Sequence, residues 1–433
     1  MNLMLSFSRS LRTLLALSVL MPALAAAQGV YFPSASAWEK RTPDQVGLLQ
    51  SSVDSAIKLA IAAESTTPRD LLENHVASSF GREPHSEAVG PFTVRSGSSG
   101  LIIRRGYIVA EWGEVDRPEN TYSVTKSFVS TTVGLAYDRK MIRSLEDPVW
   151  RYVPPVVALK GTPGARAPLA DVPPDVMGAP GTATPRPKTG SAFDAFEILE
   201  PFASEHNRKI TWDHLLRQTS DWQGTLWGKP DWADRPQGDL EQYKARARNA
   251  PGTVYTYNDV RVNALALASL MVWRRPLPQV LREHVMDPIG ASNTWRWYGY
   301  DNSWIVLDGQ LVQSMSGGAQ WGRGMIISAR DMARFGYLTL RKGKWGDRQV
   351  LSEEWIRLAT TPGVNAGYGF MNFFLNTGRR AMPSAPEASF QHRGAGNNII
   401  YLDPVNDLVV VVRWINSPRS MDGVIRQLLV GAR

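Results

Sequence analysis

Strand patterns lie toward both ends of this 433-residue chain, and helical patterns lie between them. Residues 101–112 predict a β-hairpin, with apolar runs on either side of Gly106. Residues 398–402 and 408–414 predict two further strands near the C-terminus. We therefore predict an α+β fold (an α/β sandwich), in which an antiparallel sheet is built from both chain ends, with flanking helices and a mainly helical inserted lobe.

The first 27 residues have the features of an export signal. Two arginines precede an apolar core at residues 14–20, and alanines at 25–27 offer a small-residue cleavage site. The apolar run is too short to cross a bilayer as a helix. We predict a Sec-type signal peptide over residues 1–27, cleaved near Ala27, and a periplasmic or secreted mature protein.

Residues 28–433 are numerous enough to bury a large core. We predict one domain with two lobes, a sheet lobe over about 28–122 and 300–433 and a helical lobe over about 123–299. Proline and glycine are dense in residues 154–189, which predicts a long irregular loop or, alternatively, a linker between independent domains. Apolar spacing predicts helices over residues 44–63, 123–137, 211–220, 262–273, 277–285, 329–341, 352–356 and 421–429.

Composition argues against several classes of function. The chain has no cysteine, so an exported form has no disulfides and depends on its core, to which 15 tryptophans contribute. Its six histidines show no metal-ligand spacing, so we expect no metal and no cofactor. The net charge of +8 comes from scattered arginines, which argues against nucleic acid as a partner. Beyond the signal, no apolar run suits a membrane span.

Ser123 and Lys126 form a Ser-x-x-Lys pair at the predicted start of a helix. Positions i and i+3 share a helix face, so the lysine amine can reach the serine hydroxyl and accept its proton. A helix N-terminus also offers N–H groups and a dipole that favour an oxyanion. The same motif recurs at Ser55 and Lys58, inside another predicted helix, where a solvated surface pair is the expected interpretation. We predict that Ser123 is the nucleophile.

Several segments together resemble the serine hydrolases related to class C β-lactamases, D-alanyl-D-alanine carboxypeptidases and family VIII esterases. The resemblance covers roughly residues 30–430 and rests on order and spacing. It implies a β-lactamase/transpeptidase-like fold, a hydrolase domain over 28–433, and acylation of Ser123 followed by release with water. The matching segments are residues 122–127 (YSVTKS), 210–220 (ITWDHLLRQTS), 251–257 (PGTVYTY) and 328–336 (SARDMARFG).

The family's second motif, Y-x-N, falls on Tyr257 and Asp259. The resemblance implies that Tyr257 relays the serine proton to the leaving group, and that Lys126 lies close to it. Asp259 departs from the family's asparagine. An aspartate there could pair with Lys126 and hold it charged, which would leave the role of base to Tyr257. Alternatively, Asn258 supplies the amide after a shift of one residue.

The family's third motif, K-T-G, falls on residues 392–394, His-Arg-Gly. Gly394 would allow close approach of the substrate, and the N–H groups of Ser123 and Ala395 would form an oxyanion hole. His392, in the lysine position, is mostly neutral at pH 7 and offers less to a carboxylate. β-Lactams and D-Ala-D-Ala peptides are therefore expected to be poor substrates.

Tryptophans supply candidate cleft walls, with ordinary core packing as the alternative. Trp222 is the one we assign to substrate binding, and the others are Trp227, Trp232, Trp295, Trp297 and Trp321. The predicted function is that of a secreted Ser-Lys-Tyr hydrolase that acts through an acyl-enzyme on a carboxylic ester or small amide. The alternatives are a D,D-carboxypeptidase or β-lactamase, and a non-catalytic binding protein that retains the fold. In the two enzyme cases the partner is a small molecule.

Overall fold

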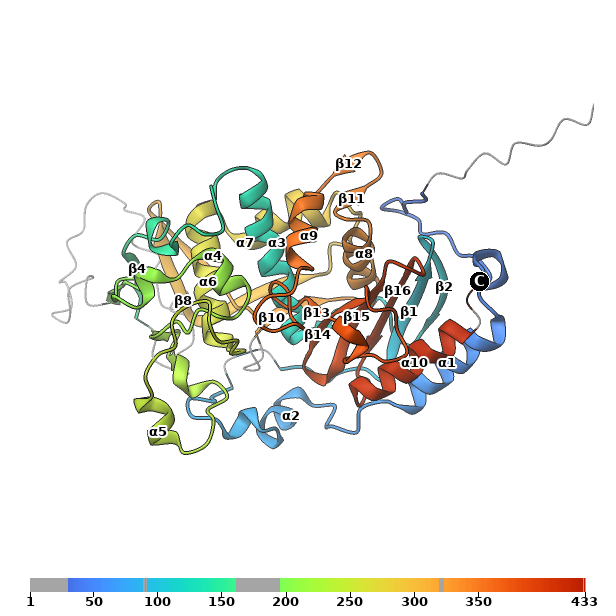
Figure 1. The fold of residues 1–433 in the computed structure, drawn as a ribbon, viewed down its shortest axis with the longest axis horizontal. Coiled ribbons are helices and arrows are strands. Elements are labelled where there is room, and N and C mark those ends of the chain that lie inside the picture. The colour runs from blue at the N-terminus through green and yellow to red at the C-terminus, as the bar shows by residue number, and fades with distance from the viewer. Residues whose placement is uncertain are drawn as a thin grey trace, which may run out of the picture.

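The computed structural model describes most of the chain: residues 30–88, 90, 92–160, 195–318, 323–430 and 432. The predicted signal peptide, most of the Pro- and Gly-rich stretch and Trp321 lie outside the described residues. Figure 1 shows the arrangement of the elements.

The main sheet has six antiparallel strands in the order β13-β14-β15-β16-β1-β2. The N-terminal and C-terminal parts of the chain meet where β16 pairs with β1, with Leu101 opposite Val411. This confirms the predicted antiparallel sheet built from both termini. The strands are β1 (Ser99–Arg104), β2 (Tyr107–Trp112), β13 (Phe374–Leu375), β14 (Phe390–Gly394), β15 (Asn398–Asp403) and β16 (Leu408–Arg413).

Helices cover both faces of this sheet, which explains why every residue of β1 and β16 is buried. One face, with Ile102 and Val410, packs on α1 (Gln50–Ala62) and α10 (Pro418–Val430), which lie side by side in Figure 1. The other face, with Leu101 and Val411, belongs to the larger core, with α8 (Ala329–Leu340) packed on it. The fold is a sandwich of helices, sheet and helices.

The inserted lobe is built around α3 (Thr125–Asp138) and α6 (Asp259–Trp273), which pack against each other. Nearly every residue of both helices is buried, as expected for helices inside a large core. Gly134 on α3 lets Trp355 pack closely, since a Cβ there would lie 2.5 Å from the indole. The other α-helices are α2 (Leu71–Ala77), α4 (Trp212–Leu216), α5 (Leu240–Ala245), α7 (Leu277–Leu281) and α9 (Glu353–Ala359).

A second sheet shows that the inserted lobe is not only helical. Its order is β3-β10-β8-β4-β5, and β9 pairs with β8. Short strands with distant partners are hard to recognise locally, because pairing rather than propensity stabilises them. The strands are β3 (Glu119–Asn120), β4 (Val156–Leu159), β5 (Phe196–Leu199), β8 (Arg296–Leu307), β9 (Gln310–Met315) and β10 (Gly324–Ile327). Two small hairpins are β6 (Thr225–Leu226) with β7 (Lys229–Pro230), and β11 (Lys344–Trp345) with β12 (Arg348–Gln349).

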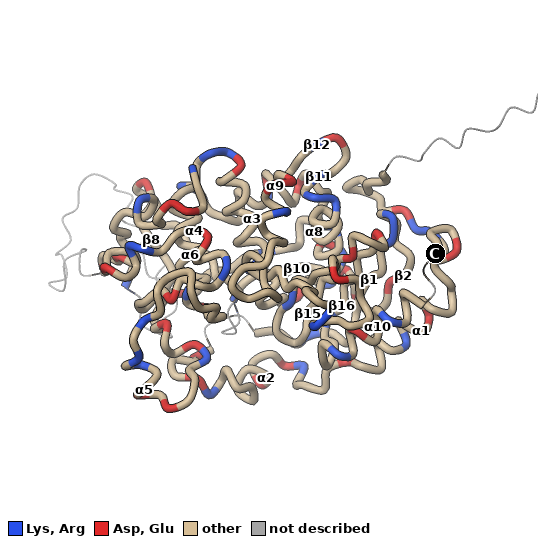
Figure 2. The backbone as a smooth tube through the Cα atoms, viewed as in Figure 1, with Lys and Arg blue, Asp and Glu red and all other residues tan. Residues whose placement is uncertain are grey.

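Segments with Lys or Arg and segments with Asp or Glu are interspersed along the described backbone in Figure 2. Within the described part of the chain, no helix combines the length and the apolar character needed to cross a membrane.

Candidate active site

Ser123 lies where the short 3-10 turn η3 (Tyr122–Val124) runs into α3. Tyr122, just before it, is buried and has a φ of 47°, which is unusual for a residue with a bulky side chain. Its N–H donates a hydrogen bond of 2.7 Å to Asn120 Oδ1, which helps to hold this turn. Backbone strain of this kind costs about 1–3 kcal/mol and is common at functional sites.

Lys126 lies one helical turn beyond Ser123, with no exposed surface. Its Nζ donates a hydrogen bond of 2.7 Å to Ser123 Oγ. The structure thus brings together the two residues of the Ser-x-x-Lys pair in the geometry that proton transfer requires.

Asp259, the first residue of α6, is the second partner of Lys126. Its Oδ1 lies 2.6 Å from Lys126 Nζ, and its Oδ2 accepts a hydrogen bond of 2.9 Å from Arg235 Nη2. Burial alone would raise the pKa of Asp259, but Arg235 and Lys126 outweigh it and hold that pKa at about 2. Burial likewise lowers the pKa of Lys126, but the charges of Asp259 and Tyr257 exceed that effect, so the pKa is raised. Lys126 is therefore an ammonium at neutral pH.

Asn258, the alternative to Asp259, has a different role in the structure. It is the N-cap of α6, and its Oδ1 accepts a hydrogen bond of 3.1 Å from the Arg261 N–H. Its Nδ2 donates to the Asp231 carbonyl at 2.8 Å, and the residue is fully buried. Contact of Asn258 with a substrate is therefore a wrong prediction, and Asp259 is the residue that reaches Lys126.

Tyr257 is half-buried between the two cations of the site. Its ring centroid lies 5.2 Å from Lys126 Nζ and 5.0 Å from Arg235 Cζ. The ring also packs on Tyr368 and Phe374 at the edge of the main sheet. Both cations therefore lie within cation–π distance of the Tyr257 ring.

The end of β14 closes the site from the other side. A Cβ added to Gly394 would lie 2.0 Å from the Thr121 carbonyl oxygen and 3.2 Å from the Ser123 nitrogen, so only glycine fits. Ala395 follows directly, in the turn η12 (Ala395–Asn397). The chain therefore brings Gly394, the residue before Ala395, next to the backbone of Ser123.

Residues 102–429 match the family model described as Beta-lactamase. The chain belongs to the beta-lactamase family. Members of this family are hydrolases, esterases among them. No curated protein matches the chain.

Solved structures share the beta-lactamase fold at low sequence identity. A penicillin-binding protein homolog from Caulobacter crescentus is 13% identical with a TM-score of 0.50, covering 89% of this chain and 99% of that one. A family VIII carboxylesterase is 15% identical with a TM-score of 0.50, covering 89% and 98%. EstCE1, a hydrolase with promiscuous acyltransferase activity, is 18% identical with a TM-score of 0.50, covering 87% and 98%. At such identities the likeness shows the fold alone.

His392, in the position of the lysine in the beta-lactamase family's K-T-G motif, points into the core. It has no exposed surface, and Nδ1 lies 2.9 Å from Ser127 Oγ. The rings of Phe335 and Phe373 pack around it. Burial lowers the pKa of His392 to about 4, so the imidazole is neutral. Binding of substrate by His392 is therefore a wrong prediction, because its side chain lies on the core side of β14.

Arg393 is the functional candidate that this strand offers instead. Neighbouring residues of a strand point to opposite faces, so Arg393 points away from the core when His392 points into it. This alternation is the signal by which Arg393 could have been found from the sequence. Its guanidinium lies 4.0 Å over the Phe374 ring, and Tyr255 and Tyr257 are among its electrostatic neighbours. Among the described residues Arg393 has no carboxylate partner, so its charge is available on the Tyr257 side of β14.

Trp222 is a core residue rather than a cleft wall. It is 1% exposed, and its Nε1 donates a hydrogen bond of 2.6 Å to the Pro201 carbonyl. The prediction that Trp222 binds substrate is therefore wrong. Trp295 and Trp297 are buried as well, whereas Trp227 and Trp232 are half-buried.

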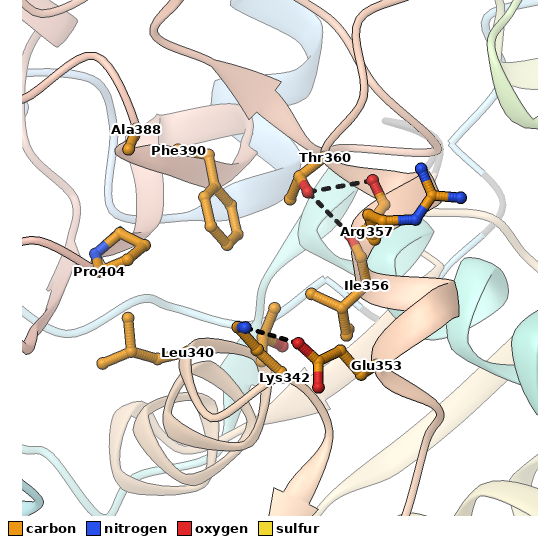
Figure 3. Close-up of a pocket in the computed structure, with 10 residues that line it drawn as sticks. Leu340, Lys342, Glu353, Ile356, Arg357, Thr360, Ala388, Phe390 and Pro404 are labelled. Atoms are coloured by element: carbon orange, nitrogen blue, oxygen red, sulfur yellow. Dashed lines mark hydrogen bonds and ion pairs between the residues drawn. The ribbon is translucent and has the colours of Figure 1, made fainter.

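Two pockets differ in how they relate to this site. One of about 260 Å³ adjoins Tyr122 and Ala395 and is lined on its other side by polar and aromatic residues in and around α2. Another, of about 340 Å³, lies between α8, α9 and β14 (Figure 3). In this pocket the charge of Lys342 is balanced by an ion pair with Glu353. Only the smaller pocket adjoins the residue before Ser123.

Proposed function

We propose that this protein is a Ser-Lys-Tyr hydrolase that acts through an acyl-enzyme on a carboxylic ester or a small amide. One observation carries the proposal: Ser123 Oγ lies 2.7 Å from Lys126 Nζ at the start of a buried helix, in a member of a hydrolase family. The predicted signal peptide would place the enzyme in the periplasm or outside the cell.

The proposed acylation begins with attack of Ser123 Oγ on the carbonyl carbon, which forms a new C–O bond. The serine proton passes to the Tyr257 oxygen as phenolate, since Asp259 keeps Lys126 charged. The carbonyl oxygen becomes an oxyanion, which the N–H groups of Ser123 and Ala395 would stabilise. The bond to the leaving group then breaks, and the leaving group takes the proton from Tyr257.

Deacylation repeats these steps with water in place of serine. Tyr257 takes a proton from a water molecule, and the resulting hydroxide attacks the acyl carbon. The bond to Ser123 Oγ breaks, and the serine regains its proton from Tyr257. Lys126 remains an ammonium and donates its hydrogen bond to Ser123 Oγ throughout.

Covalent labelling with a fluorophosphonate tests the proposed nucleophile. Ser123→Ala should abolish labelling, whereas Ser55→Ala, the matched change in the other Ser-x-x-Lys motif, should leave it intact. Labelling that survives Ser123→Ala excludes Ser123 as the nucleophile. A protein that is not labelled at all would instead support the non-catalytic binding role.

The charge of Arg393 favours a second candidate, a D,D-carboxypeptidase or β-lactamase. Substrates of both enzymes carry a carboxylate, for which a guanidinium is a suitable partner. A panel of p-nitrophenyl esters, nitrocefin and D-Ala-D-Ala peptides separates the candidates. Faster turnover of short-chain esters supports the esterase, and faster turnover of nitrocefin or the peptides supports the second candidate.

A further inference from the structure

Arg235 contacts the site although no motif includes it. It follows the turn η9 (Asp231–Ala233), and its guanidinium contacts two carboxylates: Nη2 lies 2.9 Å from Asp259 Oδ2 and Nη1 lies 2.5 Å from Asp234 Oδ2. The same guanidinium lies 5.0 Å from the ring centroid of Tyr257 and 4.8 Å from that of Phe80. Arg235 thus contacts both groups that flank Lys126.

Asp259 divides its single charge between two cations. Oδ1 faces Lys126 at 2.6 Å, and Oδ2 faces Arg235 at 2.9 Å. All three side chains lie in or near the protein interior, where such interactions are weakly screened. The strength of the Lys126–Asp259 pair therefore depends on Arg235.

The position of Arg235 is itself held by a network of charges. Asp234 Oδ2 also accepts the Asp259 N–H at 2.8 Å, and Glu83 Oε1 accepts the Arg235 N–H at 3.2 Å. Lys229 pairs with Glu83 at 2.8 Å and lies 3.8 Å from Asp234. These contacts support Arg235 in a left-handed backbone conformation, with a φ of 50°.

We propose that Arg235 is a positioning residue for the Ser123 site, which orients the Asp259 carboxylate and limits how tightly that carboxylate holds the Lys126 ammonium. The inference rests on the proposed function of Ser123. It adds a residue that acts through Asp259 and Tyr257 without forming a bond to the substrate.

The direction of the effect follows from charge. When Arg235 becomes neutral, Lys126 receives the whole charge of Asp259 and releases its proton less readily, and Tyr257 loses a neighbouring cation. With a cation removed from beside Tyr257, the proposed acceptor takes the serine proton less readily, and the acidic limb of the rate moves to higher pH. The other charges facing these groups, on Asp234 and Arg393, are unchanged by the substitution.

The test is the pH dependence of the rate at which a fluorophosphonate labels Ser123. Arg235→Gln should move the acidic limb upward by about one pH unit. Arg235→Lys keeps the charge and should leave the limb near that of the unmodified protein. Arg330→Gln is the matched control, since Arg330 is 24% exposed against 23% for Arg235 and also pairs with two carboxylates, Asp116 and Glu111.

Two results of this experiment would overturn the proposal. The first is that the acidic limb of the labelling rate lies at the same pH in Arg235→Gln as in Arg330→Gln. The other is a shift in Arg235→Lys as large as that in Arg235→Gln, because a charge effect should be restored by lysine. Circular dichroism and thermal unfolding confirm that each variant is folded before it is labelled.

A second measurement does not depend on activity. In protein labelled with ¹⁵N-lysine, the Nζ resonance of Lys126 reports its protonation, and Lys126→Met assigns it. Arg235→Gln should move the titration of Lys126 to higher pH while Asp259 is present, and should move it much less in Asp259→Asn, where the carboxylate through which Arg235 acts is gone. An unchanged midpoint in Arg235→Gln contradicts the role of Arg235, whereas failure of labelling in the unmodified protein contradicts only the proposed function.

Discussion

Lys126 Nζ lies 2.6 Å from Asp259 Oδ1, and neither side chain is more than 2% exposed. A buried ion pair of this kind is not in itself a source of stability, because removing both charges from water costs several kcal/mol per ion. Its consequence here is chemical. The pair keeps Lys126 protonated beside Ser123, where a neutral lysine would act as a base.

The first prediction concerns Asp259→Asn. Loss of the carboxylate should lower the pKa of Lys126, so in this variant the amine loses its proton at lower pH and can replace Tyr257 as the base for Ser123. The acidic limb of the pH–rate profile should then move down by about one unit or more. The profile is measured with one ester. Asp331→Asn is the control, since it removes a buried carboxylate from the first turn of α8. An unchanged limb in folded Asp259→Asn would contradict any role of the pair in catalysis.

The second prediction concerns Gly394→Ala. The added methyl group would lie 2.0 Å from the Thr121 carbonyl oxygen, so β14 must move away from Ser123. We expect the rate of fluorophosphonate labelling to fall by about tenfold or more, because a displaced oxyanion hole stabilises the transition state less. Gly367→Ala is the control, since its methyl group meets nothing closer than 3.4 Å. Equal labelling in both variants would show that Ala395 is not needed.

The third prediction separates substrates by charge. Arg393→Gln should lower kcat/KM for nitrocefin and other carboxylate-bearing substrates by about tenfold to 150-fold, the effect of losing a charge-assisted hydrogen bond. Neutral p-nitrophenyl esters should be affected less than threefold. A similar loss on neutral and anionic substrates would instead assign Arg393 to packing against Phe374.

The fourth prediction concerns stability and His392. The pKa of His392 is about 4 in the folded protein, against an ordinary value of 6.5, because the imidazole is buried. Below pH 6.5 the histidine binds a proton in the unfolded chain but not in the folded protein. The free energy of unfolding therefore falls by about 1.4 kcal/mol for each unit by which the pH is lowered. Between pH 6.5 and 4 the unmodified protein should thus lose about 3 kcal/mol more than His392→Gln. Urea unfolding at pH 7, 5.5 and 4 measures this. Parallel pH dependence in the two proteins would contradict the burial argument.

Much of the main sheet could be predicted from the sequence. The hairpin at β1 and β2 and the strands β15 and β16 have strong apolar patterns, and such patterns indicate burial wherever the partner lies. The strands β4 and β5 were not predicted, because each has only four residues and is stabilised by pairing with strands distant in the sequence. Helix α2 was not predicted either, although Asp70 caps its first turn.

The sequence by itself determined the Ser123–Lys126 contact, because three residues of helix bring two side chains together whatever surrounds them. It also indicated Asp259 as the departure from the family pattern, but left Asn258 as an alternative after a shift of one residue. Only the tertiary structure decided between them, since the capping geometry of α6 turns Asn258 inward and Asp259 toward Lys126. Arg235 could be found only in the folded chain, because charges brought together from separate loops leave no periodic pattern in the sequence.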